Sequence, residues 1–137
     1  MISQELATGL NQQIEKEAFA SSLYLSMSSW CDLKGMKGAA AFLRRQSDEE
    51  RVHMLKIFDF LHDVDEHAMV PSIPKPESSF ESINQIMQMV YEHEKSVTQS
   101  IFKLLESCNK QDDFVTFNFL QFYVIEQREE ESLMRDI

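Results

Sequence analysis

Residues 67–80, HAMVPSIPKPESSF, decide the fold of this chain. Pro71, Pro74 and Pro76 exclude a helix here, because each lacks a backbone N–H and its ring clashes with the preceding turn. The chain on both sides carries apolar residues at alternating spacings of three and four, which is typical of amphipathic helices. A helix of roughly 28 residues is about 42 Å long, and roughly 13 extended residues reach about 43–47 Å. The segment can therefore run the full length of a helical bundle.

Two helices are predicted before this segment. Ser3 can cap the first helix, which runs to about Lys34, where Gly35 provides a left-handed stop. The second helix begins near Gly38 and runs to about Glu66. Because the connection between them has only a few residues, the two helices should be antiparallel neighbours.

Two more helices are predicted after the segment. Ser79 is one candidate N-cap of the third helix and Ser82 is its rival, and the helix runs to about Ser107. A turn in residues 108–113 leads into a fourth helix that continues to the chain end. Since the segment starts the third helix at the far end of the bundle, the second and third helices should be parallel. The prediction is an all-α four-helix bundle with one long crossover between helices two and three, forming a single domain over residues 1–137.

Composition limits the possible functions. The 137 residues are 43% hydrophobic, with only three glycines, and carry a formal charge of −10. This charge argues against nucleic acid and anionic membrane surfaces as partners, since both attract basic patches, and it favours cations. Cys31 and Cys108 are far apart and indicate reduced thiols. The start of the chain lacks a signal-peptide pattern, and no apolar run is long enough for a membrane span, so the cytoplasm is expected.

The apolar face of each predicted helix is interrupted by polar residues near its middle. These residues share one helical face with their apolar neighbours and are Glu17, Glu50, His53, Glu94, Gln127 and Glu130. Counted from the turns, they lie within roughly one to two helical turns of a common level. Buried carboxylates cost several kcal/mol each unless they are paired or bind metal. Four glutamates balance two divalent cations, so a dinuclear metal site is predicted; the alternative is a polar layer without metal.

The order of these motifs resembles that of the bacterial non-haem ferritins over essentially the whole chain. The similarity rests on Glu17, on Glu50-x-x-His53 in DEERVHML and on Glu94 in YEHEK. It extends to Gln127-x-x-Glu130 in EQREEE. The four helices and the crossover agree with the resemblance, which implies a ferritin-like bundle.

The resemblance implies a ferroxidase that oxidises Fe(II) to Fe(III) with O2 or peroxide at a di-iron centre within one subunit. Glu17, Glu50 and His53 would hold one iron. Glu50, as a bridge, with Glu94 and Glu130 would hold the other. Oxygen ligands with a single imidazole suit iron, and open positions between the metals leave room for the oxidant.

Further residues receive roles from the same resemblance. Gln127 would lie near the irons and orient a bound oxygen species or water. Tyr24 corresponds to a tyrosine beside the iron centre, and it is either a redox participant or a core hydrogen-bond donor. Glu49, Glu126 and Glu129 resemble a third, weaker iron site; the alternative is a solvated helix face.

Cofactor and assembly expectations complete the resemblance. Haem-binding relatives carry Glu-x-x-His on the fourth helix and a methionine beside the second-helix motif, whereas this chain has Gln127-x-x-Glu130 and Val52, so no haem is expected. The family implies a homo-oligomeric shell of 24 subunits that stores iron. Such ferritins usually add a fifth helix, and this chain stops at Ile137. If that difference prevents cage assembly, the alternative is a smaller, non-storing di-metal oxidase or metal-binding bundle.

Overall fold

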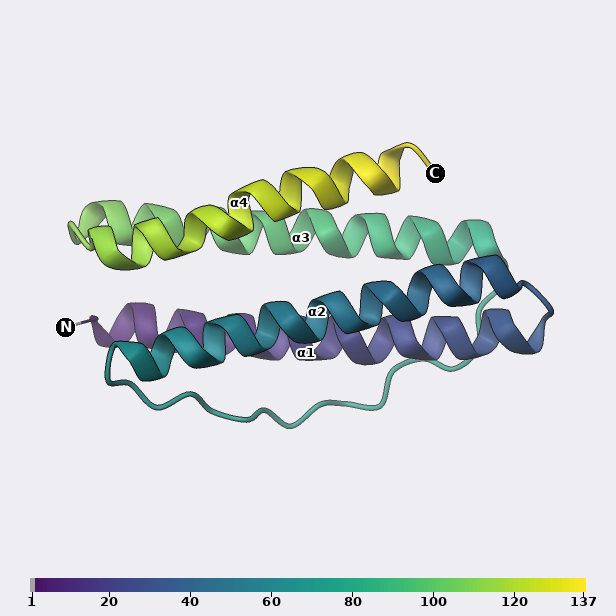
Figure 1. The fold of residues 1–137 in the computed structure, drawn as a ribbon, viewed down its shortest axis with the longest axis horizontal. Helices are drawn as coiled ribbons and strands as arrows, with labels where there is room; N and C mark the ends of the chain where they lie inside the picture. Colours follow the sequence, from purple (N-terminus) through teal and green to yellow (C-terminus); the bar gives the residue numbers. More distant parts are fainter. Residues whose placement is uncertain (1) are drawn as a thin grey trace.

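The computed structural model describes residues 2–137, and within them it consists of four α-helices without a β-strand. Helix α1 spans Gln4–Leu33, α2 spans Lys37–Asp63, α3 spans Ile83–Lys110 and α4 spans Phe114–Arg135 (Figure 1). The predicted all-α bundle is confirmed.

Local chemistry explains where the helices begin. The Ser3 side chain accepts a hydrogen bond from a backbone N–H of the first turn of α1 at 3.1 Å. Gly35 takes a φ of 80°, a left-handed conformation that glycine adopts without steric cost, and this permits the short turn into α2. Ser82, and not Ser79, caps α3, because its side chain accepts the backbone N–H of Gln85 at 3.0 Å.

Two predicted helix ends were displaced by a few residues. Helix α2 ends at Asp63, before the predicted Glu66, and Asp65 has a left-handed φ of 62°. Acidic side chains near a helix C-terminus oppose the helix dipole, which explains why the last acidic residues do not extend α2. Helix α3 instead continues past Ser107 to Lys110.

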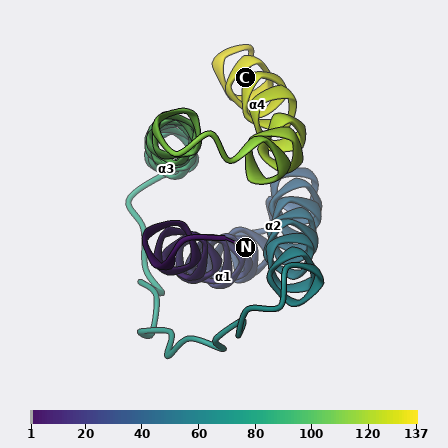
Figure 2. The same cartoon turned by 90° about the vertical axis from the view of Figure 1, so that its left-hand side faces the viewer.

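The four helices form two hairpins joined by a long crossover. Figure 1 shows α1 packed beside α2 and α3 beside α4, with the linker running along the length of the bundle. Figure 2, the view along the bundle, places the linker outside α1 and α2. Helices α2 and α3 consequently run in the same direction, as predicted. None of the helices in residues 2–137 combines the length and the apolar character that crossing a membrane requires.

The hydrophobic core is divided into two clusters by a polar layer. One cluster contains, from the four helices in turn, Leu10, Ile57, Ile101 and Leu120. The other contains, in the same order, Met27, Leu43, Val90 and Met134. On every helix the interrupting polar residues lie between the members of the two clusters. The bundle therefore surrounds the polar layer with apolar packing at both ends.

Candidate metal centre

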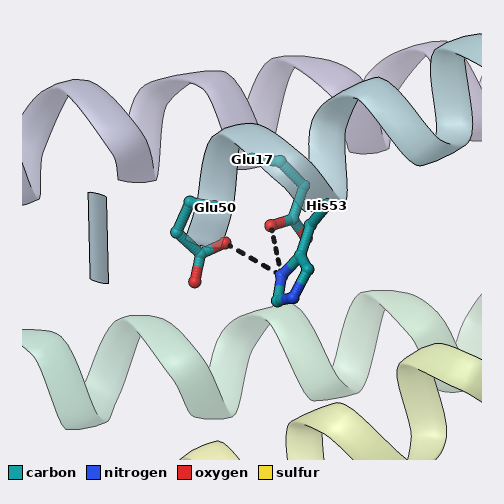
Figure 3. A group of neighbouring side chains, drawn as sticks. All are labelled: Glu17, Glu50 and His53. Atoms are coloured by element: carbon teal, nitrogen blue, oxygen red, sulfur yellow. Dashed lines mark ion pairs between the residues drawn. The ribbon is translucent and has the colours of Figure 1, made fainter. Parts of the chain in front are cut away.

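Three side chains from the first hairpin converge in the polar layer. Glu17 comes from α1, and Glu50 and His53 lie one turn apart on α2. Each offers one ligand atom, and these atoms lie within 4.8 Å of one another. Figure 3 shows one oxygen of each carboxylate directed at the same nitrogen of the His53 ring. The Nδ1 atom of His53 lies 3.7 Å from Glu17 Oε2 and 3.6 Å from Glu50 Oε2.

These distances fit a shared cation better than hydrogen bonds. Separations of 3.6 and 3.7 Å are too long for a hydrogen bond, but two atoms that each ligate one ion at about 2.0–2.2 Å can lie up to about 4.4 Å apart. Four of the facing atoms have no hydrogen-bond partner within residues 2–137: Glu17 Oε2, Glu50 Oε1 and Oε2, and His53 Nδ1. All three residues are almost completely buried, so the group has the character of a cation site.

Burial and neighbouring charges shift the pKa values of this group in different directions. Burial raises the pKa of Glu50 well above its usual range, and the charges of Glu17 and Glu94 add to the effect. Burial also raises the pKa of Glu17, but contacts with Glu50, His53 and Gln13 outweigh it and lower the pKa overall. For His53, burial lowers the pKa, yet the carboxylates of Glu17 and Glu126 raise it to about 9. A metal that binds here must therefore displace protons.

The carboxylate of Glu94 on α3 is hydrogen-bonded on both of its oxygens. The Tyr24 hydroxyl donates to Glu94 Oε1 at 2.7 Å, and Gln127 Nε2 donates to Glu94 Oε2 at 3.0 Å. Gln127 also donates to the Glu94 backbone carbonyl at 3.2 Å, which ties α4 to α3. Tyr24 thus makes the core hydrogen bond that the sequence offered as one of its two roles. Burial raises the pKa of Tyr24 well above its usual value, and the nearby charge of Glu94 raises it further.

Glu130 completes the layer from α4. It is buried, and its Oε2 has no hydrogen-bond partner within the described part of the chain. Burial raises the pKa of Glu130 to about 8, with further contributions from Glu94 and Glu49. The pKa of Glu130 therefore depends both on the buried layer, through Glu94, and on Glu49, an acid of the proposed third site.

The three candidate residues of the third site are distributed less tightly. Glu126 faces His53, with its Oε2 3.2 Å from His53 Nε2. Glu129 is exposed and lines a groove between α3 and α4. Across residues 2–137, Glu49, Glu126 and Glu129 do not form a group as compact as that of Glu17, Glu50 and His53.

Sequence reasoning missed one residue that contacts the centre. Gln13 is buried on α1, and its Nε2 donates to Glu17 Oε1 at 3.0 Å. This bond leaves Oε2 as the Glu17 oxygen that faces His53. The spacing carried the necessary signal, because Gln13 lies four residues before Glu17 and so shares its helical face.

Comparisons with known proteins agree with this geometry. The family model described as the ferritin-like domain matches residues 7–137. A bacterial non-heme ferritin of Campylobacter jejuni is 44% identical over 137 residues, which cover 100% of this chain and 82% of that protein. A bacterial non-heme ferritin of Escherichia coli is 40% identical over 137 residues, covering 100% of this chain and 83% of that protein.

Solved structures show the same architecture. Chlorobium tepidum ferritin superimposes with a TM-score of 0.96 at 36% identity, covering 99% of this chain and 83% of that one. An open pore ferritin from Archaeoglobus fulgidus gives a TM-score of 0.97 at 40% identity, with the same coverage of 99% and 83%. With sequence, fold and buried acid layer in agreement, this chain belongs to the ferritin family, and its relatives include the bacterial non-haem ferritins.

Proposed function

We propose that this protein is a ferroxidase that oxidises Fe(II) to Fe(III) for iron storage. The observation that carries the proposal is the buried group of Glu17, Glu50 and His53, whose facing atoms lack hydrogen-bond partners within residues 2–137. Carboxylate oxygens with one imidazole suit Fe(II) and favour Fe(III) more strongly still. The whole of residues 1–137 acts as one domain in this proposal.

Two irons per chain are the substrate. Glu17, Glu50 and His53 bind the first ion, and Glu50 bridges to a second ion held by Glu94 and Glu130. Each Fe(II) loses one electron; O2 takes up the two electrons with two protons to give hydrogen peroxide. When peroxide is the oxidant, two electrons and two protons convert it into two waters. Gln127 orients the oxidant or a water, and the Tyr24 hydroxyl donates a hydrogen bond to Glu94.

A third iron binds more weakly beside this pair. Glu49, Glu126 and Glu129 are its ligands, and the link to the dinuclear centre runs through Glu130, whose pKa is influenced by Glu49. Two of these acids are already associated with the centre, while Glu129 must reorient from its exposed position. Haem is not part of this proposal.

Storage requires an enclosed volume, so we propose a homo-oligomeric shell of 24 subunits in the cytoplasm. The relatives from Campylobacter jejuni and Escherichia coli carry the name bacterial non-heme ferritin, and the aligned solved structures are ferritins. Sedimentation or mass photometry of the purified protein measures the assembled mass. A monomer or dimer would remove the storage part of the proposal and leave the oxidase.

The chemistry is tested by the initial rate of O2-dependent Fe(II) oxidation at two irons per chain. Wild type should oxidise iron rapidly, whereas Glu50→Ala and His53→Ala should lose more than the roughly 10- to 100-fold that removal of an outer metal-site partner costs. Glu106→Ala, at an exposed position of α3, is the matched control and should keep the wild-type rate. Equal slow rates in all four proteins would contradict the ferroxidase assignment.

A further inference from the structure

We propose that Glu126 is a positioning residue that holds the His53 ring so that the lone pair of Nδ1, and not a ring carbon, faces the first iron. The inference rests on the proposed function, and it assigns Glu126 a role separate from that of a third-site ligand. It concerns the protein's own side chains and can be tested with metals that undergo no redox reaction.

The two ring nitrogens of His53 face opposite surroundings. Nδ1 faces Glu17 and Glu50 at 3.7 and 3.6 Å and has no hydrogen-bond partner in residues 2–137. Nε2 lies 3.2 Å from Glu126 Oε2, within hydrogen-bond range. A neutral imidazole has one N–H and one lone pair. If Nε2–H donates to Glu126, the lone pair lies on Nδ1, where the metal would bind.

Aromatic packing around His53 does not provide this discrimination. Phe122 and Tyr123 both contact the ring edge-on, each with a centroid distance of 5.9 Å. The Tyr123 hydroxyl donates to the His53 backbone carbonyl at 2.7 Å, which fixes the helix but not the ring. A half-turn of the imidazole exchanges nitrogen for carbon with little change in shape, so these contacts tolerate it. Among these contacts, only the Glu126 carboxylate distinguishes the two orientations.

The position of Glu126 also couples two metal positions. Its side chain is 26% exposed, whereas that of His53 is 3% exposed, so the carboxylate links solvent to the buried ring. Oε2 contacts His53, and Oε1 remains to bind an outer cation. Metal ligands in proteins commonly depend on such outer partners, whose removal costs about 10–100-fold in affinity. Glu126 would thus serve the first and the third ion at once.

The test is calorimetric titration of the full chain, stripped of metal with a chelator, with Zn(II). Glu126→Ala should weaken the first equivalent by about 10- to 100-fold, and the visible spectrum of the first bound Co(II) should change. Glu126→Gln keeps a carbonyl acceptor for Nε2–H while losing the charge, so it should retain most of the affinity and the spectrum. Glu106→Gln, which removes one exposed acid from α3, is the matched control and should keep the wild-type affinity and spectrum.

Each result of these titrations either supports or contradicts the positioning role of Glu126. Wild-type affinity and spectrum in Glu126→Ala would overturn the inference, since aromatic packing alone would then suffice. Equal losses in Glu126→Ala and Glu126→Gln would also overturn it, because charge and not orientation would be responsible. If Glu126→Ala fails to fold, as judged by circular dichroism, Glu126→Leu replaces it as the variant without an acceptor. A wild type that binds no first equivalent of Zn(II) or Co(II) tightly would instead remove the proposed function itself.

Discussion

The two hairpins contribute to the metal centre in different ways. The α1–α2 hairpin supplies Glu17, Glu50 and His53, whose facing atoms lack hydrogen-bond partners within residues 2–137. On the other side of the layer, both Glu94 oxygens on α3 accept hydrogen bonds, one from Tyr24 and one from Gln127. Glu94 therefore differs from Glu17 and Glu50, whereas Glu130 on α4 resembles them, because its Oε2 also lacks a hydrogen-bond partner within residues 2–137.

A bound cation should be stabilised more by the group of Glu17, Glu50 and His53 than by Glu94. Buried polar atoms without partners are costly, so an ion at the α1–α2 group relieves a cost that the fold otherwise bears. An ion that uses Glu94 must compete with two existing donors. We therefore expect the first metal to bind at Glu17, Glu50 and His53, and Glu94 to matter only for the second.

The largest expected effect separates the two sides by mutation. Glu17→Ala should weaken the first equivalent of Zn(II) by more than the roughly 10- to 100-fold typical of outer partners, since it removes a ligand. Glu94→Ala should leave the first equivalent intact and remove the second. Titration calorimetry of the metal-stripped proteins measures both events. Similar losses of the first equivalent in the two variants would mean that the two sides act as one site.

A change of pH should alter the affinity for the first metal ion. The pKa of His53 is raised to about 9, so its ring carries an extra proton at neutral pH, and burial shifts the pKa of Glu50 upward, which favours its protonated form. Metal binding must release these protons, and affinity should rise by up to about tenfold per pH unit for each one released. The first-equivalent Zn(II) affinity should accordingly increase from pH 6 towards pH 9. An affinity that does not change over this range would show that the group binds metal without proton release.

The smallest effect concerns Tyr24 on α1, which donates to Glu94 on α3. Tyr24→Phe removes the hydrogen bond to Glu94 Oε1. The metal-free protein should lose about 1 kcal/mol of stability, as expected for one buried hydrogen bond. Binding of the second Zn(II) should become slightly tighter, because Glu94 no longer has that competing donor, while the first equivalent stays unchanged. Thermal unfolding and calorimetry measure the two quantities, and weaker second binding would assign Tyr24 a supporting role instead.

Much of this architecture could be predicted from sequence because it depends on local rules. The Ser3 cap, the Gly35 turn and the length of the proline-containing linker are determined by nearby residues. The choice of Ser82 over Ser79 could not be settled, since both serines precede the same apolar pattern and the cap depends on where the linker meets the bundle.

The candidate metal centre, too, could be predicted from the sequence only in part. Helical spacing predicted that Glu17, Glu50 and His53 would share the core-facing layer, and the structure brings them together. Spacing could not predict that Glu94 accepts from Tyr24 and Gln127, because side-chain orientation depends on three helices at once. The roles of these residues as iron ligands remain predictions that the binding experiments address.

The connection between the hairpins has a mechanical consequence. The linker runs along the outside of α1 and α2 and buries only Ala68 in the core; Asn11 on α1 holds it by donating to the His67 carbonyl at 3.1 Å and accepting the Met69 N–H at 2.8 Å. The acid layer crosses the bundle between the two core clusters, and both hairpins contribute carboxylates to it. Cations bound between the residues of the α1–α2 hairpin and those of the α3–α4 hairpin would join the two hairpins. Metal binding would then also stabilise the fold of a single subunit.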